Sequence, residues 1–287
     1  PADLVAGNGL IEAGTFIGIL LGTLAGSALI TTSHGAALTA GLGLFIAGLG
    51  IVFSHKIPPV PAAQPGLRLR WNLPAEITTL LTEARSNRPV WFAILGISWF
   101  WALGASLLAE FPVLAHDQLH ASAHVVSAMF GVFAIGIGIG SLAIARFGHR
   151  ASTLTPVAVS GLAVTVFTAD FALTGRTAPA LPSLSGLLAS LAGWHLLADL
   201  LLLAVCGGAF SVPLYVRLQK YAAPSHRARM IGANNVVNAL ASVAAAGLTA
   251  ALYAAGLRAP AILLILAMAN AAIAAWIWRY QGIFVPS

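Results

Sequence analysis

Long apolar runs, each about twenty residues in length, alternate with short polar segments along most of this chain. A membrane-spanning helix needs about 20 mostly apolar residues, whereas the strands of a membrane β-barrel alternate over about 10 residues. The runs are apolar on all sides, so they predict helices. We expect eight spans, namely Gly9–Thr31, Gly35–Phe53, Val90–Leu108, Val125–Ala145, Thr155–Leu173, Trp194–Leu214, Met230–Ala254 and Pro260–Trp278.

The composition supports the same fold class, an all-α polytopic membrane bundle. Hydrophobic residues make up 59% of the chain and charged residues only 8%, and the mean hydropathy is +0.91. A soluble globular domain carries about 25% charged residues. The single cysteine, Cys206, excludes an intrachain disulfide or a cysteine metal cluster.

The basic residues predict how the spans are oriented. When alternate loops are assigned to opposite sides of a membrane, Arg176 and Arg258 fall on one side and all other basic residues on the other. Cytoplasmic loops carry the excess of Lys and Arg, so we expect both ends of the chain in the cytoplasm and no nucleic-acid partner. The cytoplasmic set is Lys56, Arg68, Arg70, Arg85, Arg88, Arg146, Arg150, Arg217, Lys220, Arg227, Arg229 and Arg279.

One connection, Ser54–Pro89, is much longer than the others. It begins with the Pro-rich stretch "KIPPVPAAQPG", which is typical of extended chain. It continues with "PAEITTLLTEARSN", which places Ile77, Leu80 and Leu81 on one face of a short helix. This helix either lies on the inner membrane surface or packs on the bundle.

Two segments of the chain resemble each other. "AGNGLIEA" from Ala6 and "GANNVVNA" from Gly232 both open a span that starts in the cytoplasm. Each places Asn and a second polar residue four positions apart on one helical face, Asn8 with Glu12 and Asn234 with Asn238. They begin the first and the seventh predicted span, and six spans is the repeat length of transporters built from two six-helix halves.

This repeat predicts the domain organisation. The eight spans correspond to spans five to twelve of a twelve-span fold, so we expect four further spans before Pro1. Residues 1–53 then hold the last two spans of the first half, residues 54–89 form the cytoplasmic linker between the halves, and residues 90–287 form the second half.

Glu12 has two interpretations. The partial positive charge of a helix N-terminus favours a carboxylate in the first turns. Alternatively, the paired spans line a central pathway, since charged groups within spans usually face a water-filled cavity. On the second interpretation, Asn8, Glu12, Asn234 and Asn238 lie on the substrate path.

Five segments together resemble the major facilitator superfamily and, within it, the bacterial lysophospholipid transporters, above all those fused to an acyltransferase and an acyl-carrier-protein synthetase. They are "NGLIEAGT" from Asn8, "ISWFWALGASLLAEFP" from Ile97, "FAIGIGIGS" from Phe133, "GGAFSVPLYVRLQ" from Gly207 and "HRARMIGANNVVNAL" from His226.

The resemblance implies a bacterial inner-membrane protein, without cofactor, that moves lysophospholipid from the outer to the inner leaflet by alternating access. A fused or associated acyltransferase would be its partner. The alternatives are an exporter of drugs or other small amphiphiles, and a transport-inactive scaffold for an acyltransferase. An enzyme is not expected, because no phosphate loop, dinucleotide motif or nucleophile elbow occurs.

"SLAIARFGHR" from Ser141 resembles the loop motif of the superfamily. Ser141 takes the Gly position and Ala145 the Asp position, whereas Arg146, Gly148 and Arg150 are kept. By resemblance, these three residues hold neighbouring cytoplasmic helix ends together and gate the inward opening. The alternative is that Arg146 and Arg150 only determine topology.

The remaining polar candidates lie toward the outer ends of spans. His195 and Asp199 share a helical face and form either a proton-coupling pair or a mutually satisfied pair. Glu110 and Asp170 are shallow carboxylates, expected to be wet, and Glu110 is a substrate-path candidate. Trp99 faces lipid, packs on a neighbouring helix, or borders a cavity for an acyl chain.

A cluster of histidines precedes the fourth span. His116, His120 and His124 follow one another at spacings of four, with Asp117 beside the first. On one unbroken helix they would suit zinc or copper. Pro112 precedes the cluster, and the segment lies in an outer loop, so we expect a solvated loop and no metal site.

Overall fold

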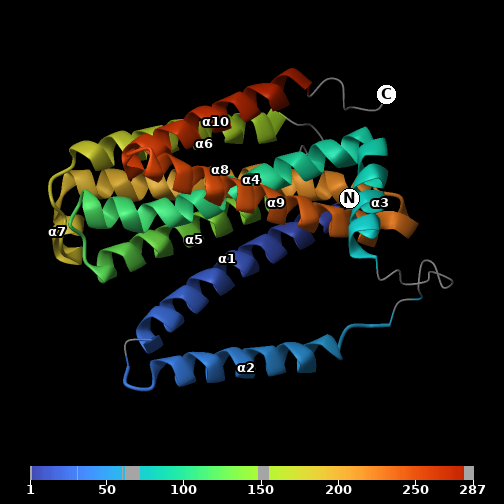
Figure 1. Cartoon of the computed structure of the whole chain (residues 1–287), viewed down its shortest axis with the longest axis horizontal. Helices are drawn as coiled ribbons and strands as arrows, with labels where there is room; N and C mark the ends of the chain where they lie inside the picture. Colours follow the sequence, from blue (N-terminus) through green and yellow to red (C-terminus); the bar gives the residue numbers. More distant parts are fainter. Residues whose placement is uncertain (1, 31, 60, 62–71, 148–154, 281–287) are drawn as a thin grey trace.

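A computed structural model describes residues 2–30, 32–59, 61, 72–147 and 155–280 of the chain. Within these ranges every regular element is helical (Figure 1). The short elements are α3 (Leu73–Ser86), α7 (Leu184–Ala189) and the 3-10 turn η2 (Pro224–His226). The long helices are α1 (Ala2–Ile30), α2 (Gly35–Ser54), α4 (Arg88–Asp117), α5 (Ala123–Phe147), α6 (Thr155–Thr177), α8 (Leu191–Tyr221), α9 (Arg227–Ala254) and α10 (Ala259–Tyr280).

The long helices confirm all eight predicted spans. Each is long and apolar enough to cross a membrane, and the chain is a multi-pass membrane protein. Two helices continue well past their predicted ends, α4 through Pro112 to Asp117 and α8 through Pro213 to Tyr221. Membrane helices tolerate proline because neighbouring groups compensate the lost backbone hydrogen bond.

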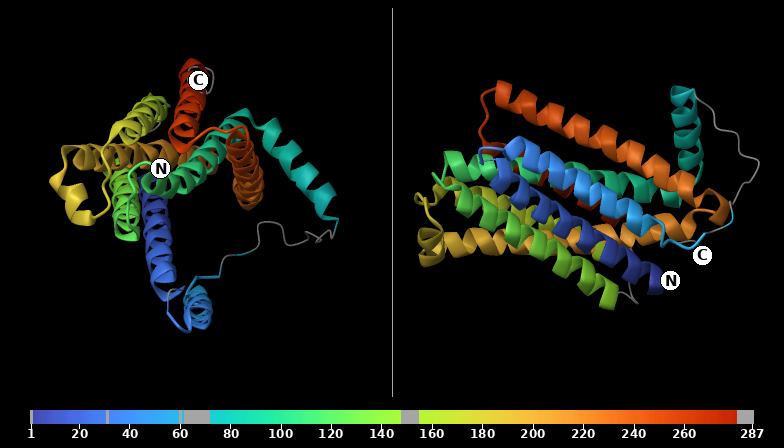
Figure 2. Two further views of the ribbon diagram at one scale, coloured as in Figure 1. Left: turned by 60° about the vertical axis from the view of Figure 1, so that its left-hand side comes forward. Right: turned by 90° about the horizontal axis from the view of Figure 1, so that it is seen from below.

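Six of the long helices form a closely packed bundle, namely α4, α5, α6, α8, α9 and α10 (Figure 2). Helix α8 packs on α5, α6 and α4, while α10 packs mainly on α6, and α9 mainly on α4. Aromatic rings join these layers. Phe111 of α4 meets Phe133 of α5 and Phe171 of α6 edge to face, with ring centroids 5.5 and 5.3 Å apart. We name the two ends of the bundle the α3 end and the α7 end (Figure 1).

Helices α1 and α2 form an arm beside this bundle (Figure 1). The buried side chains of α1 all lie between Val5 and Phe16, where the helix packs on α5 and α8. Beyond Phe16 no described side chain of α1 is buried, and in α2 only Gly35 is buried. The arm is therefore attached through the α3-end half of α1.

The closest approach of α1 to α5 is at Gly9. A Cβ atom on Gly9 would lie 2.8 Å from the Cβ of Ala145 and 2.9 Å from the carbonyl oxygen of Ser141. Only glycine permits this separation between the two backbones. Ser141 and Ala145, the two positions that depart from the superfamily loop motif, are thus among the residues of α5 that contact α1.

The predicted amphipathic helix is α3, and it packs on the bundle. Asn72 caps it by accepting a hydrogen bond of 3.3 Å from the Ala75 backbone N–H. Ala84 is fully buried and Leu80 packs against the core, while α3 contacts α9 and α4. Of the two alternatives that the sequence left open, packing on the bundle is the one observed.

Glycines bring α5 and α8 into backbone contact. A Cβ atom on Gly140 would overlap the carbonyl group of Val205, and one on Gly208 would lie 2.5 Å from the carbonyl oxygen of Ile137. Small residues allow membrane helices to approach closely and so gain packing energy. The α5–α8 contact therefore depends on Gly140 having no side chain.

We predict that Gly140→Ala lowers the thermal unfolding midpoint of the detergent-solubilised protein, because overpacking costs about 1–3 kcal/mol. Gly131→Ala, on the same helix, is the matched control, since nothing lies within 4 Å of its added Cβ. The control is expected to leave the midpoint unchanged or slightly higher, because alanine favours the helix. An equal decrease of the unfolding midpoint in both variants would show that the close α5–α8 backbone contact does not determine the stability.

Candidate functional site

A polar cluster lies where α1, α4 and α9 meet α8, in the half of the bundle toward the α3 end. Its hub is Tyr215 of α8, whose hydroxyl accepts a 2.7 Å hydrogen bond from Trp101 Nε1 of α4. Glu12 of α1 and Asn234 and Asn238 of α9 are also close enough to interact with Tyr215. The structure therefore brings both copies of the sequence repeat to one residue.

Helix α8 contributes a polar stripe to this cluster. Ser211, Tyr215 and Gln219 are spaced by four residues and so share one helical face. Ser211 lies beside Glu12, and Gln219 bonds Asn8. Sequence reasoning missed this stripe, although its spacing was visible within the segment from Gly207.

Glu12 is buried, with only 4% of its surface exposed, and its Oε1 atom has no hydrogen-bond partner among the residues that the structure describes. The first-turn interpretation does not describe this position, because α1 begins at Ala2 and Glu12 lies in its third turn. A buried polar atom without a partner calls for a specific explanation, such as a ligand or a water molecule. Glu12 therefore places a buried acceptor near Tyr215.

The asparagines Asn8, Asn234 and Asn238 of the repeat differ in their hydrogen bonds. Asn8 and Gln219 bond each other reciprocally, with N–O distances of 3.2 and 2.9 Å, and Asn8 also donates to the Leu4 carbonyl. Asn8 thus ties α1 to α8. Asn234 is buried, and its Oδ1 has no hydrogen-bond partner. Asn238 accepts a 2.7 Å hydrogen bond from Ser98 of α4, which ties α9 to α4.

Glu110 is not the wet, shallow carboxylate that the sequence predicted. Only 1% of its surface is exposed, and it accepts a 2.6 Å hydrogen bond from the Tyr253 hydroxyl of α9. The prediction was wrong because α4 continues to Asp117, which places Glu110 inside the bundle. Its partner comes from a helix more than a hundred residues away in sequence.

Trp99 borders two cavities. One, of about 30 Å³, lies among α4, α5, α6, α8 and α10, and the other, of about 340 Å³, lies among α4, α9 and α10. Trp99 Nε1 donates a 2.8 Å hydrogen bond to Asn270, which donates in turn to the Gly161 carbonyl and to Thr165. Two of the three predicted roles, packing on a neighbour and bordering a cavity, are thus combined in Trp99.

The pair His195 and Asp199 includes a third member, Asp170 of α6. His195 Nε2 lies 3.0 Å from Asp170 Oδ2 and 3.7 Å from Asp199 Oδ2. One possible ligand atom from each residue lies within 4.8 Å of the others, so these three side chains have a spacing that could hold a cation. The sequence feature that could have linked Asp170 to this pair was its position near the outer end of α6, the span that precedes α8.

The histidine cluster near the α7 end is divided between elements. Helix α4 ends at Asp117, His120 lies in the turn with a φ of 52°, and His124 lies in the first turn of α5. His116 Nδ1 lies 2.8 Å from Asp117 Oδ1 on the exposed surface. The single unbroken helix that a metal site required is therefore interrupted.

The superfamily loop motif is described only in part. Arg146 is exposed at the end of α5, whereas Gly148 and Arg150 lie outside the described residues. A gating role for these three residues stays a prediction.

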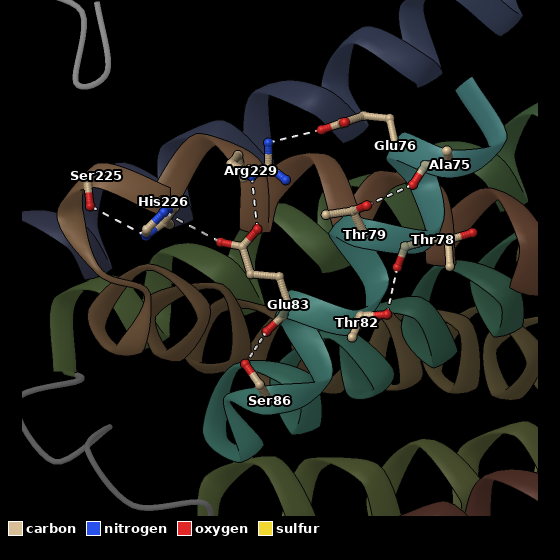
Figure 3. A network of polar contacts seen from close by, with 10 residues as sticks. All are labelled: Ala75, Glu76, Thr78, Thr79, Thr82, Glu83, Ser86, Ser225, His226 and Arg229. Carbon is tan, nitrogen blue, oxygen red and sulfur yellow. Dashed lines mark hydrogen bonds and ion pairs between the residues drawn. The ribbon is translucent and has the colours of Figure 1, made fainter. Parts of the chain in front are cut away.

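A second polar network joins α3 to the start of α9 (Figure 3). Arg229 donates to Glu83 at 2.9 Å and to Glu76 at 3.0 Å, and His226 Nε2 lies 3.7 Å from Glu83. These charges lie at the bundle end, where the Arg229 side chain is 21% exposed. The network fixes the orientation of α3 on α9.

We predict that Arg229→Gln increases hydrogen exchange of the α3 backbone amides by about threefold to tenfold. Partly exposed ion pairs contribute about 1 kcal/mol or less each, and this change removes two of them. Arg88→Gln, an exposed arginine at the start of α4, is the matched control and should leave α3 exchange unchanged. Mass spectrometry resolves the effect, and equal exchange in both variants would contradict it.

Comparison with known proteins identifies relatives of the chain. The profile of the Major Facilitator Superfamily matches residues 1–194. The chain is 30% identical over 243 residues to the lysophospholipid transporter LplT of Escherichia coli (strain UTI89 / UPEC) and to that of Shigella sonnei (strain Ss046). These matches cover 82% of this chain and 54% of each relative, so the chain spans about half the length of the curated relatives it matches. The names of these relatives describe transporters and not enzymes. No solved structure matches the chain.

Proposed function

The chain belongs to the major facilitator superfamily, and we propose that it forms part of a transporter that moves lysophospholipid across the bacterial inner membrane. The observation that carries this proposal is Glu12, a buried carboxylate with an oxygen that no donor among the described residues satisfies. A zwitterionic headgroup carries an ammonium group that would supply the missing interaction.

The polar stripe of α8 would serve as the headgroup path. Ser211 and Tyr215 lie on one face of α8, with Glu12 of α1 beside Ser211 and Asn234 of α9 near Tyr215. Polar and ionisable residues inside a membrane bundle typically mark a substrate path, because burying them in lipid is costly. The acyl chain needs no polar lining and can remain in apolar surroundings throughout the movement.

The attachment of α1 suggests how access alternates. At the α3 end, Gly9 contacts α5 closely, whereas toward the α7 end a space of about 170 Å³ lies between Phe16 and Leu20 of α1 and Phe133 of α5. We propose that the α3 end is cytoplasmic, along with both ends of the chain. On this assignment the α1–α5 contact is closed toward the cytoplasm and looser toward the outside. Movement would run from the outer to the inner leaflet, where an acyltransferase, fused or separate, would use the product.

The proposed division of the chain follows the same contacts. Residues 1–53 would belong to the first half, 54–89 to the linker and 90–287 to the second half, which matches the separation of the α1–α2 arm from the six-helix bundle (Figure 1). Arg229 and its partners on α3 would then attach the linker to the second half.

The two alternatives make different predictions in one flux assay. Proteoliposomes containing the full-length protein should move fluorescent lysophosphatidylethanolamine between leaflets and should not concentrate cationic dyes. Dye accumulation without lipid movement would indicate an exporter of other amphiphiles. A protein that supports re-acylation but moves neither compound would be a scaffold.

We predict that Glu12→Gln slows the transport of lysophosphatidylethanolamine by about tenfold or more, since a hydrogen bond to a charged group contributes about 1.5–3 kcal/mol. Lysophosphatidylglycerol, which lacks the ammonium group, should be slowed much less. Asp117→Asn, an exposed carboxylate paired with His116, is the matched control. Equal slowing of both lipids by Glu12→Gln would assign Glu12 a structural role.

A further inference from the structure

The α7 end of the bundle carries a pocket that contains two arginines. It has a volume of about 460 Å³ and is lined by Arg176 at the end of α6, by Gln118 after α4, and by the turn between α9 and α10 with Arg258. Gly256 allows this turn, because its φ of +86° is in the left-handed region. Three separate connections therefore converge on one space.

These two arginines differ from the other basic residues of the chain. They are the two of the fourteen Lys and Arg residues that the alternation of spans assigns to the outer side. Both are exposed, and neither forms an ion pair with a described residue. The nearby carboxylate Asp117 is itself paired with His116. The pocket thus offers two guanidinium groups without a protein anion.

The geometry around the arginines favours an anion with several oxygen atoms. Guanidinium groups bind phosphate through paired N–H donors. Helix α10 begins at Ala259, next to Arg258, and a helix N-terminus adds partial positive charge. The Gln118 amide supplies a further possible donor.

An apolar pocket continues from this site along the same two helices. The 340 Å³ cavity is lined by Leu252 of α9 and by Ile265 of α10, whereas Gly256 and Leu264 line the arginine pocket. Leu257 of the arginine pocket donates a 3.1 Å backbone hydrogen bond to the carbonyl of Leu252 of the apolar cavity, and Leu264 directly precedes Ile265. A charged head region and an apolar region therefore adjoin, with Trp99 lining the apolar one.

We propose that the groove between α9 and α10 captures one lysophospholipid molecule from the outer leaflet, with its phosphate between Arg176 and Arg258 and its acyl chain in the apolar cavity. This inference rests on the proposed function and adds an entry site to it. The arginine pocket is separate from the Glu12 cluster, which lies toward the α3 end, whereas the apolar cavity reaches Trp99, the sequence neighbour of Ser98. Free phosphate shares the headgroup chemistry, so the test separates the two sources.

Binding is measured by the quenching of tryptophan fluorescence in the full-length protein, using lysophosphatidylethanolamine with a brominated acyl chain. The double change Arg176→Gln/Arg258→Gln should weaken its apparent affinity by about tenfold or more. Brominated monoacylglycerol, which has no phosphate, should bind the variant and the wild-type protein equally. Arg279→Gln, an exposed arginine at the α3 end, is the matched control and should change neither ligand.

The apolar part of the site has its own variant. Ala245→Leu fills the cavity and should weaken binding of both acylated ligands, while leaving glycerophosphoethanolamine unaffected. Ala239→Leu, at an exposed position on the same helix, is its control. Equal effects of these two changes, or displacement of the lysolipid by inorganic phosphate alone at the same affinity, would overturn the capture site.

Transport kinetics separate this inference from the proposed function. If the capture site and the transport function both hold, the double arginine variant raises the KM for lysolipid in the outer leaflet about tenfold and leaves kcat nearly unchanged. If the wild-type protein transports lysolipid and the double arginine variant has the same KM, the capture site is rejected while the transport function stands. Arginine-dependent binding in a wild-type protein that moves no lysolipid would support the capture site and reject the transport function.

Discussion

The structure depends on one constraint, which is that polar groups inside a membrane must find their partners within the protein. The backbone meets this constraint by forming helices, and this is why every regular element of the described residues is helical. Side chains meet it through contacts between helices, such as Glu110 with Tyr253 and Trp99 with Asn270. Against this background, Glu12 is informative because one of its buried oxygens lacks a partner.

The same constraint explains how the packing is divided among residue types. Lipid is as apolar as leucine, so apolar side chains alone do not drive helices together, and close contact between small residues must contribute. Gly140 and Gly208 supply that contact between α5 and α8, and Gly9 supplies it between α1 and α5. The polar stripe from Ser211 to Gln219 continues the same face of α8 from Gly208, one helical turn further along.

The sequence was sufficient to predict the eight spans, the α3 helix and the family, because each is encoded in local patterns. It did not predict which polar residues meet. Glu110 was placed too close to the surface, because the predicted span ended at the last apolar residue before this carboxylate. The partner that allows Glu110 to be buried, Tyr253, lies on a helix distant in sequence and could not be identified from the local pattern. Asp170 was considered separately from His195 and Asp199 for the same reason. Contacts between helices depend on how each helix is rotated, and hydropathy constrains that rotation weakly in a chain that is apolar on nearly every face.

The two copies of the repeat show how similar sequences acquire different roles. Asn8 and Asn234 occupy matching positions, yet Asn8 is held by Gln219 and Asn234 keeps an unpartnered oxygen. Four residues later the roles of the two copies are exchanged. Glu12 of the first copy has the unpartnered oxygen, whereas Asn238 of the second copy accepts a hydrogen bond from Ser98. Each copy thus uses one polar residue to fix its helix and leaves one oxygen free toward Tyr215. Under the proposed function, the bonded residues would hold the walls of the headgroup path, while the two unpartnered oxygens would serve as acceptors.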